Sequence, residues 1–237
     1  MPTPSQQIVA QLAAQYGSFD PTRQQLLRKT YYDYVRYSPA GVSSLTLFTV
    51  PLGGTDPVSL LTKTAEQTNL SRSAQFENVS FIIYQIRTHI FLLPKNRQPS
   101  AISSQVYLVN GGWAAVQAAL VDLADQGEFL MKIGQKDYFT VDCPFRRMPP
   151  GFGVEIGGIP SATAASGTPV NFWMQQSARQ QDIYTLTPPQ MIENQQTFTV
   201  NVAFPRASSP AIPQVNSANS AVDIGVLFDG YVIEPVQ

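Results

Sequence analysis

From residue 42 onward, the apolar residues of this chain recur with a period of two. Successive side chains of a β-strand point to opposite faces of a sheet, so this spacing is typical of strands that are buried on one side. Turn-forming residues separate the runs and limit their lengths. The chain is therefore predicted to be mainly β, folded as an antiparallel β-sandwich. Strands are expected in residues 45–50, 79–93, 128–133, 138–141, 170–174, 197–204 and 222–233.

The longest of these runs shows how its strand should be oriented. Strict alternation over residues 81–93 puts the even-numbered residues on one face and the odd-numbered residues on the other. The even face is apolar apart from Thr88, whereas the odd face is polar at its centre, with Gln85, Arg87 and His89. One face is predicted to be core.

The first forty residues have a different, helical periodicity. Residues 5–16 place apolar side chains on one face, and residues 20–38 begin with Asp20 as an N-cap and Pro21 at the first helical position. Two helices are predicted there, forming an arm too short to bury its own apolar stripes. The chain is thus divided into an arm at 1–40 and a sandwich at 41–237, with a crossing helix expected at 114–126.

An arm that cannot fold alone must dock on the body or on a neighbouring subunit. Its apolar stripes supply most of the candidate subunit contacts, and two arginines before a proline-rich loop could pair with carboxylates of a neighbour. The candidate contacts are Ile8, Leu12, Leu26, Leu27, Tyr31, Tyr34, Arg146 and Arg147.

Charge is scarce throughout the chain. Charged residues make up 13% of the sequence and the formal net charge is −1, and surfaces close to neutrality resist self-association less than highly charged ones. Without a basic field, direct binding to nucleic acid is not expected. The start of the chain does not resemble a signal peptide and no run of about 18 apolar residues occurs, which predicts synthesis in the cytoplasm without a membrane span.

Residues that could perform chemistry are few. The chain has one histidine, His89, and one cysteine, Cys143, and no Gly-x-Ser-x-Gly motif, whereas nucleophilic triads and zinc sites need several such groups close together. His89 is expected to hydrogen-bond across the sheet or to meet a partner subunit. No catalytic residue, metal ligand or cofactor is predicted, so we do not expect an enzyme. A carboxylate-based hydrolase is kept as an alternative, because Asp223, Asp229 and Glu234 lie close in sequence.

Three segments resemble viral, bacteriophage-like jelly-roll capsid proteins. They are residues 129–141 running into Met148-Pro-Pro-Gly, residues 195–205, and the closing strand at 222–236. The likeness lies in neutral strands, loops rich in Pro and Gly, a helical N-terminal arm and a strand that ends the chain. It implies a single eight-stranded jelly roll, since a double roll would need about sixteen strands.

The resemblance implies a structural virion protein, a capsid subunit made in the host cytoplasm that self-assembles through sandwich and loop contacts. Trimers, pentamers or hexamers of a shell are the implied homo-oligomers, with other capsid proteins as further partners. Residues 1–40 carry a net charge of only +2, from four basic and two acidic residues. The arm is therefore expected to grip neighbours, a minor protein or an internal membrane surface rather than the genome. The alternative is a carbohydrate- or receptor-binding module of a phage appendage, with Trp113, Trp173 or Tyr231 as stacking platforms.

Overall fold

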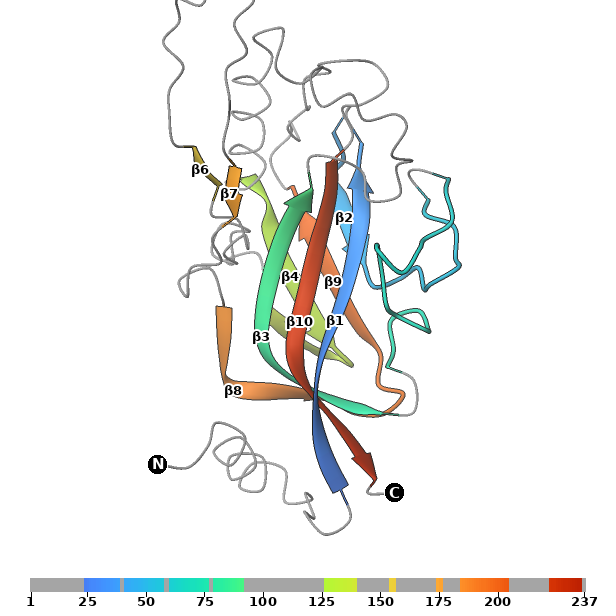
Figure 1. Cartoon of the computed structure of the whole chain (residues 1–237), viewed down its shortest axis with the longest axis vertical. Helices are drawn as coiled ribbons and strands as arrows, with labels where there is room; N and C mark the ends of the chain where they lie inside the picture. The colour runs from blue at the N-terminus through green and yellow to red at the C-terminus, as the bar shows by residue number, and fades with distance from the viewer. Residues whose placement is uncertain are drawn as a thin grey trace, which may run out of the picture.

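A computed structural model describes residues 24–38, 41–57, 60–76, 79–91, 126–139, 154–156, 174–176, 184–204 and 222–235. Two four-stranded antiparallel sheets in this part of the chain face each other as a β-sandwich (Figure 1). The strands are β1 (Gln24–Tyr37), β2 (Ser44–Leu47), β3 (Ser80–Phe91), β4 (Glu128–Ile133), β5 (Lys136–Phe139), β6 (Val154–Ile156), β7 (Met174–Gln176), β8 (Tyr184–Ile192), β9 (Phe198–Ala203) and β10 (Val222–Pro235).

The strands pair in a nested pattern. The first pairs with the last, β1 with β10, and then β2 pairs with β9, β3 with β8 and β4 with β5, all antiparallel. Two further pairings, β10 with β3 and β9 with β4, join these four pairs into sheets of order β1-β10-β3-β8 and β2-β9-β4-β5. Strands β6 and β7 form a separate two-stranded ribbon. The order of the sheets therefore follows from one long folded-over hairpin.

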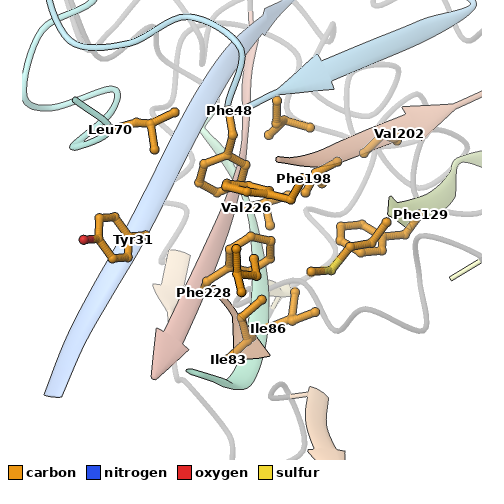
Figure 2. Close-up of a cluster of buried hydrophobic side chains, with 14 of the residues drawn as sticks. Tyr31, Phe48, Leu70, Ile83, Ile86, Phe129, Phe198, Val202, Val226 and Phe228 are labelled. Atoms are coloured by element: carbon orange, nitrogen blue, oxygen red, sulfur yellow. The ribbon is translucent and has the colours of Figure 1, made fainter. Parts of the chain in front are cut away.

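Aromatic rings fill the space between the two sheets (Figure 2). Phe48 is stacked on Phe228 with 4.8 Å between ring centroids, which joins the end of β2 to the centre of β10. Phe76 is stacked on Phe198 at the same distance, and Tyr31 of β1 lies 4.2 Å from Phe76. Contacts of this kind add to the hydrophobic gain from burying large side chains. The core thus ties both sheets to the segment that connects β2 to β3.

Most of the predicted strands are confirmed. The runs at 45–50, 79–93, 128–133, 138–141, 197–204 and 222–233 correspond to β2, β3, β4, β5, β9 and β10, with shifts of up to a few residues at their ends. For the run at 170–174, only Met174 lies within the described residues, as the first residue of β7. Strands β6 and β8 were not predicted. The sequence of β8 contains Pro188 and Pro189, which argue against a strand by local preference but are tolerated at a sheet edge.

The helix predicted for residues 20–38 is wrong, because Gln24–Tyr37 forms strand β1. Its apolar residues fit a helical stripe, but Tyr31, Asp33, Val35 and Tyr37 also alternate, and all four are buried on the core side. Fourteen consecutive pairs with β10 decide between the two patterns, since packing and pairing override local propensity. Strand β1 thus belongs to the sandwich although it precedes the boundary that we placed at residue 40.

The other predicted helices stay predictions. The helix at 5–16 and residues 114–125 of the crossing helix lie outside the described residues. Among the described residues Gln126 alone is helical, and it is the last residue of the predicted crossing helix, so the architecture stated here is the β-sandwich.

The strict alternation predicted for β3 is also wrong at one point. The pairing register shifts between Asp229 and Gly230 on β10 and between Ile83 and Gln85 on β3, which marks a β-bulge. Before the bulge the odd-numbered Ile83 faces the main core, and after it the even-numbered Ile86 does. Ile82 instead packs on the other face of the sheet, in a small apolar cluster with residues such as Tyr231 and Ile233. Tyr84 is the extra residue of the bulge, and because of it the side chains that follow point to the opposite face from the one that strict alternation predicts.

Gly230 makes this bulge possible. A Cβ atom at Gly230 would lie 1.8 Å from the carbonyl oxygen of Ile82, which is backbone and cannot rotate away. We expect Gly230→Ala to lower the free energy of unfolding by about 3 kcal/mol or more, measured by urea denaturation. Gly53→Ala is the control, because Gly53 has a φ of +80° but nothing within 4 Å of the added atom. It should cost only about 1–2 kcal/mol. Equal losses would contradict the close approach at Gly230.

Candidate functional site

The outer face of the sheet containing β1, β10 and β3 carries ion pairs between strands. Arg87 of β3 donates from Nε to Asp229 Oδ2 at 2.5 Å and from Nη2 to Oδ1 at 2.9 Å, and Thr30 of β1 donates to the same Oδ1 at 2.6 Å. Nearer the other end of β10, Arg36 Nε lies 3.1 Å from Asp223 Oδ1. Each pair joins β10 to a neighbouring strand. A two-point contact of arginine with a carboxylate fixes geometry as well as adding energy.

His89 belongs to the same face. The hydroxyl oxygen of Tyr34 lies 3.2 Å from His89 Nδ1, and the Tyr34 ring passes over Gly225, where a Cβ atom would lie 2.2 Å from it. The contact therefore reaches from β1 across β10 to β3. Burial raises the pKa of the Tyr34 hydroxyl well above its ordinary value, although Arg87 acts in the opposite direction. The phenol stays protonated, and the predicted hydrogen bond of His89 across the sheet is confirmed.

Strand β1 lies at the edge of its sheet, and the segment of residues 64–70 covers that edge. Tyr34 N donates to Gln67 O at 2.8 Å, and Asn69 N donates to Tyr32 O at 3.3 Å. The Asn69 side chain completes the cover, because it accepts from Tyr32 N at 3.0 Å and donates to Thr30 O at 2.8 Å. Polar groups of an open strand edge would otherwise invite pairing with another chain. Over residues 30–34, this edge is therefore covered within the molecule.

Immediately before that segment, the chain forms a short hairpin. Gly53 N donates to Lys63 O at 3.0 Å, Lys63 N donates to Gly54 O at 2.8 Å, and Asp56 N donates to Leu61 O at 2.9 Å. We call residues 52–57 and 60–63 the leucine hairpin. In Figure 1 it belongs to the cyan loop that runs beside β1, away from β3 and β8. These three backbone hydrogen bonds hold its two arms together.

A buried ion pair anchors the hairpin on the sandwich. Lys63 Nζ lies 2.7 Å from Asp33 Oδ1 of β1, and both side chains are fully buried. The other carboxylate oxygen, Asp33 Oδ2, accepts from Phe48 N at 2.6 Å. Burial raises the pKa of Asp33 above its ordinary value, while the charge and hydrogen bond of Lys63 act to lower it. Buried pairs of this kind position a segment more than they stabilise the fold. Here the pair fixes the hairpin base to β1 and β2.

The hairpin presents leucines to solvent. Leu60 is 76% exposed, and Leu52 and Leu61 are each about half exposed. Leu60 also has a φ of +58°, in the left-handed region that a leucine seldom adopts. Both features cost free energy in an isolated molecule. A strained, exposed leucine on a firmly anchored hairpin is therefore a candidate contact point for another surface.

A groove lies over the second sheet. It measures about 300 Å³ and is formed where β4, β5 and β9 adjoin. Its lining is more apolar than polar, and residues from all three strands contribute to it. The lining residues are Leu130, Met131, Lys132, Asp137, Phe139, Thr199 and Asn201.

The structure separates the predicted contact residues into three groups. Tyr31 is buried in the main core and Tyr34 is buried in the outer-face contact with His89, so both already have intramolecular roles. Leu26 packs against Ile82, whereas Leu27 is 43% exposed. The remaining four lie outside the described residues: Ile8, Leu12, Arg146 and Arg147.

The other sequence hypotheses are placed as follows. Tyr231, a predicted stacking platform, packs against Ile82 on the outer face, and Trp113 and Trp173 lie outside the described residues. Asp223 and Asp229 are engaged with Arg36 and Arg87 rather than with each other. Among the described residues, no helix is long and apolar enough to cross a membrane, and no three His, Cys, Asp or Glu side chains are grouped as a metal site.

Sequence reasoning missed the leucine hairpin and its anchor. Two turn signals, Gly53-Gly54 and Asp56-Pro57, stand just before two adjacent leucines, and this combination could have indicated an exposed hairpin. No local signal pairs Lys63 with Asp33, because thirty residues separate them.

Comparisons with protein-family models, with curated proteins and with solved structures found no significant match to this chain.

The anchor predicts a pH-dependent defect. Lys63→Met should lower the free energy of unfolding by about 3–5 kcal/mol near neutral pH, because it leaves the Asp33 carboxylate buried without its cation. Removing Lys63 also removes two of the influences that lower the Asp33 pKa, its charge and its hydrogen bond, so the folded-state pKa rises further. A raised carboxyl pKa favours the folded state only when the group is protonated. The defect should therefore shrink as the pH falls, measured by urea denaturation between about pH 7 and pH 4.

Lys29→Met is the matched control, since Lys29 is exposed on β1. It should lower the free energy of unfolding by no more than about 1 kcal/mol at both pH values, the worth of its contact with the Tyr31 ring, whose centroid lies 4.7 Å from Lys29 Nζ. A Lys63→Met defect that is the same at both ends of the range would contradict the anchoring role given to the Asp33 carboxylate.

Proposed function

We propose that this protein is a structural subunit of a viral shell, built on a single eight-stranded jelly roll. The nested pairing is the observation that carries the proposal: β1 with β10, β2 with β9, β3 with β8 and β4 with β5. A jelly roll is a long hairpin of four antiparallel strand pairs rolled into two facing sheets. The sheet orders β1-β10-β3-β8 and β2-β9-β4-β5 fit that description with β6 and β7 as an insertion.

Jelly rolls serve as capsid, lectin and cupin domains, so the fold alone does not choose among them. Cupin chemistry depends on several histidines around a metal, and the whole sequence contains one. In the structure, that histidine contacts Tyr34 on the outer face of a sheet. These observations favour a protein that acts through its surfaces over one that acts through a metal centre.

The leucine hairpin favours assembly over the recognition of a sugar. Among its described residues the hairpin exposes Leu52, Leu60 and Leu61 with Thr55 and Thr62, and no charged or aromatic side chain. Such a projection suits a protein contact, whereas sugar sites combine an aromatic platform with polar groups that fix orientation. The low charge of the whole chain is compatible with close packing of copies. The proposal therefore places this chain in a virion as a homo-oligomer of trimers, pentamers or hexamers, with the helix expected at residues 5–16 gripping neighbours.

The proposal predicts that the full-length chain assembles. Multi-angle light scattering of the purified protein over a wide concentration range should give masses that are multiples of the 26.0 kDa chain. Removal of residues 1–23 tests the proposed arm without cutting β1, which begins at Gln24. The truncated chain should form smaller or weaker assemblies than the full chain.

A full-length chain that remains monomeric up to the highest soluble concentration would contradict the shell proposal. If such a monomer bound glycans saturably in a screen, the binding-module alternative would replace it.

A further inference from the structure

We infer that residues 5–16 of each chain fold back and dock on an apolar patch on the outer face of the sheet β1-β10-β3-β8. We call this surface the outer patch. It consists of Ile82 and the five side chains packed around it, Leu26, Tyr84, Met191, Tyr231 and Ile233. The inference goes beyond the proposed function, because it concerns a single chain and does not require that copies assemble.

The outer patch is continuous across all four strands of the sheet. Tyr231, Ile82 and Met191 are register partners in one row from β10 through β3 to β8, and Leu26 of β1 is the partner of Ile233 in the next row. Ile82 is fully buried, whereas the five side chains around it are each only partly buried. None of the six is charged, while the ion pairs between strands lie further along the same face. The patch is thus a small apolar core whose outer side chains remain partly exposed.

Residues 5–16 carry an apolar face of matching size. Ile8, Leu12 and Tyr16 recur at every fourth residue, a spacing that puts them on one side whether the segment is helical or extended. In the helix predicted for this segment they span about 12 Å, because each residue advances by about 1.5 Å. The four strands under the patch span about 14 Å, since neighbouring strands lie about 4.8 Å apart. No charged side chain occurs before Asp20, so docking would desolvate none.

The chain enters the sandwich beside the outer patch. Strand β1 begins at Gln24, two positions before Leu26 of the patch, so only residues 17–23 link the segment to this surface. A link of this length can span up to about 25 Å when extended, which is enough to turn back over a patch of this width. In Figure 1 the start of β1 and the end of β10 lie together at the bottom of the view.

The other long segments that adjoin β3 and β10 lie at the opposite end of the sheet. Residues 92–125 follow β3 and residues 205–221 precede β10, at the end where Phe91 pairs with Asp223. Residues 1–23 instead join the sheet at the end that carries the patch. Their position in the chain therefore favours them as the cover of this surface.

A short link also favours the chain's own segment over that of a neighbour. A tethered partner acts at an effective concentration in the millimolar range, whereas a segment of a second chain must first meet the patch. We therefore assign the outer patch to residues 5–16 of the same chain. The polar side of the segment, which carries Gln7, Gln11 and Gln15, would remain available for the contacts with neighbours proposed above.

Thiol labelling of the full-length chain tests whether the segment covers the patch. Met191→Cys places a thiol in the outer patch on β8, and its modification by a maleimide is followed by peptide mass spectrometry, with Cys143 left in place. Adding Leu12→Asp should accelerate labelling at position 191 about tenfold or more, because a charge on the apolar side opposes docking. Gln11→Asp is the matched control, since it adds the same charge on the polar side. Equal labelling rates in these two double variants would overturn the inference.

Cross-linking identifies the chain that supplies the segment. Leu12→Cys and Ile233→Cys are combined in one chain and treated with a short bismaleimide, and the products are separated on a denaturing gel. The single-chain band should contain the link between positions 12 and 233, identified by peptide mass spectrometry. In the control chain, Thr46→Cys, exposed on β2 of the other sheet, replaces Ile233→Cys and should give a much lower yield. A yield no higher than in the control contradicts the docking, and a link found mainly in the two-chain band assigns the patch to a neighbour's segment instead.

The outcomes separate this inference from the proposed function. If the full-length chain assembles in light scattering but labelling and cross-linking give the contrary results, the docking is wrong and the shell proposal stands. If the chain remains monomeric while residues 5–16 protect the patch, the docking holds and the shell proposal is overturned.

Discussion

Strand β10 is bonded on both sides, to β1 along fourteen residue pairs and to β3 along eleven, and this double pairing holds the rest of the sandwich in place. Because β10 comes last in the described chain and β1 first, the sheet that contains them closes only when the most distant segments meet. The next pairs, β2 with β9 and β3 with β8, then lie inside the first. A fold of this kind is dominated by long-range contacts, which are formed at the cost of large loops.

Polar side chains on β1 and β10 help to hold these strands in the sheet. On the outer face, the carboxylates of Asp229 and Asp223 accept from Arg87 and Arg36, so β10 is fastened to the strand on each side. On the core side, the Asp33 carboxylate holds Lys63 and the backbone of Phe48. The same strand thus closes the sheet and positions a loop. Charged residues are scarce in this chain, and six of those that the structure describes form these three ion pairs.

The segment between β2 and β3, which β1 holds in place, gives this sandwich a distinctive surface. A β-sandwich supplies a stable body, and the segments between its strands supply the surfaces on which function depends. In the segment between β2 and β3, residues 64–70 cover the edge of β1 at residues 30–34, and residues 52–57 and 60–63 form the leucine hairpin. Where the edge is covered, β1 cannot pair with a strand of another chain.

The sequence by itself determined that the chain is a β-sandwich, because alternation fixes which residues can be buried together and needs no partner to be recognised. It also located most strands, including β4 to the residue. At β1 it predicted a helix, wrongly, because both periodicities fit there and only the pairing with β10 decides. It could not find the bulge at Tyr84, which depends on Gly230 meeting the backbone of Ile82, or the pairing of Asp33 with Lys63. Those features exist only between segments far apart in the chain, and local preference contains no information about such distances.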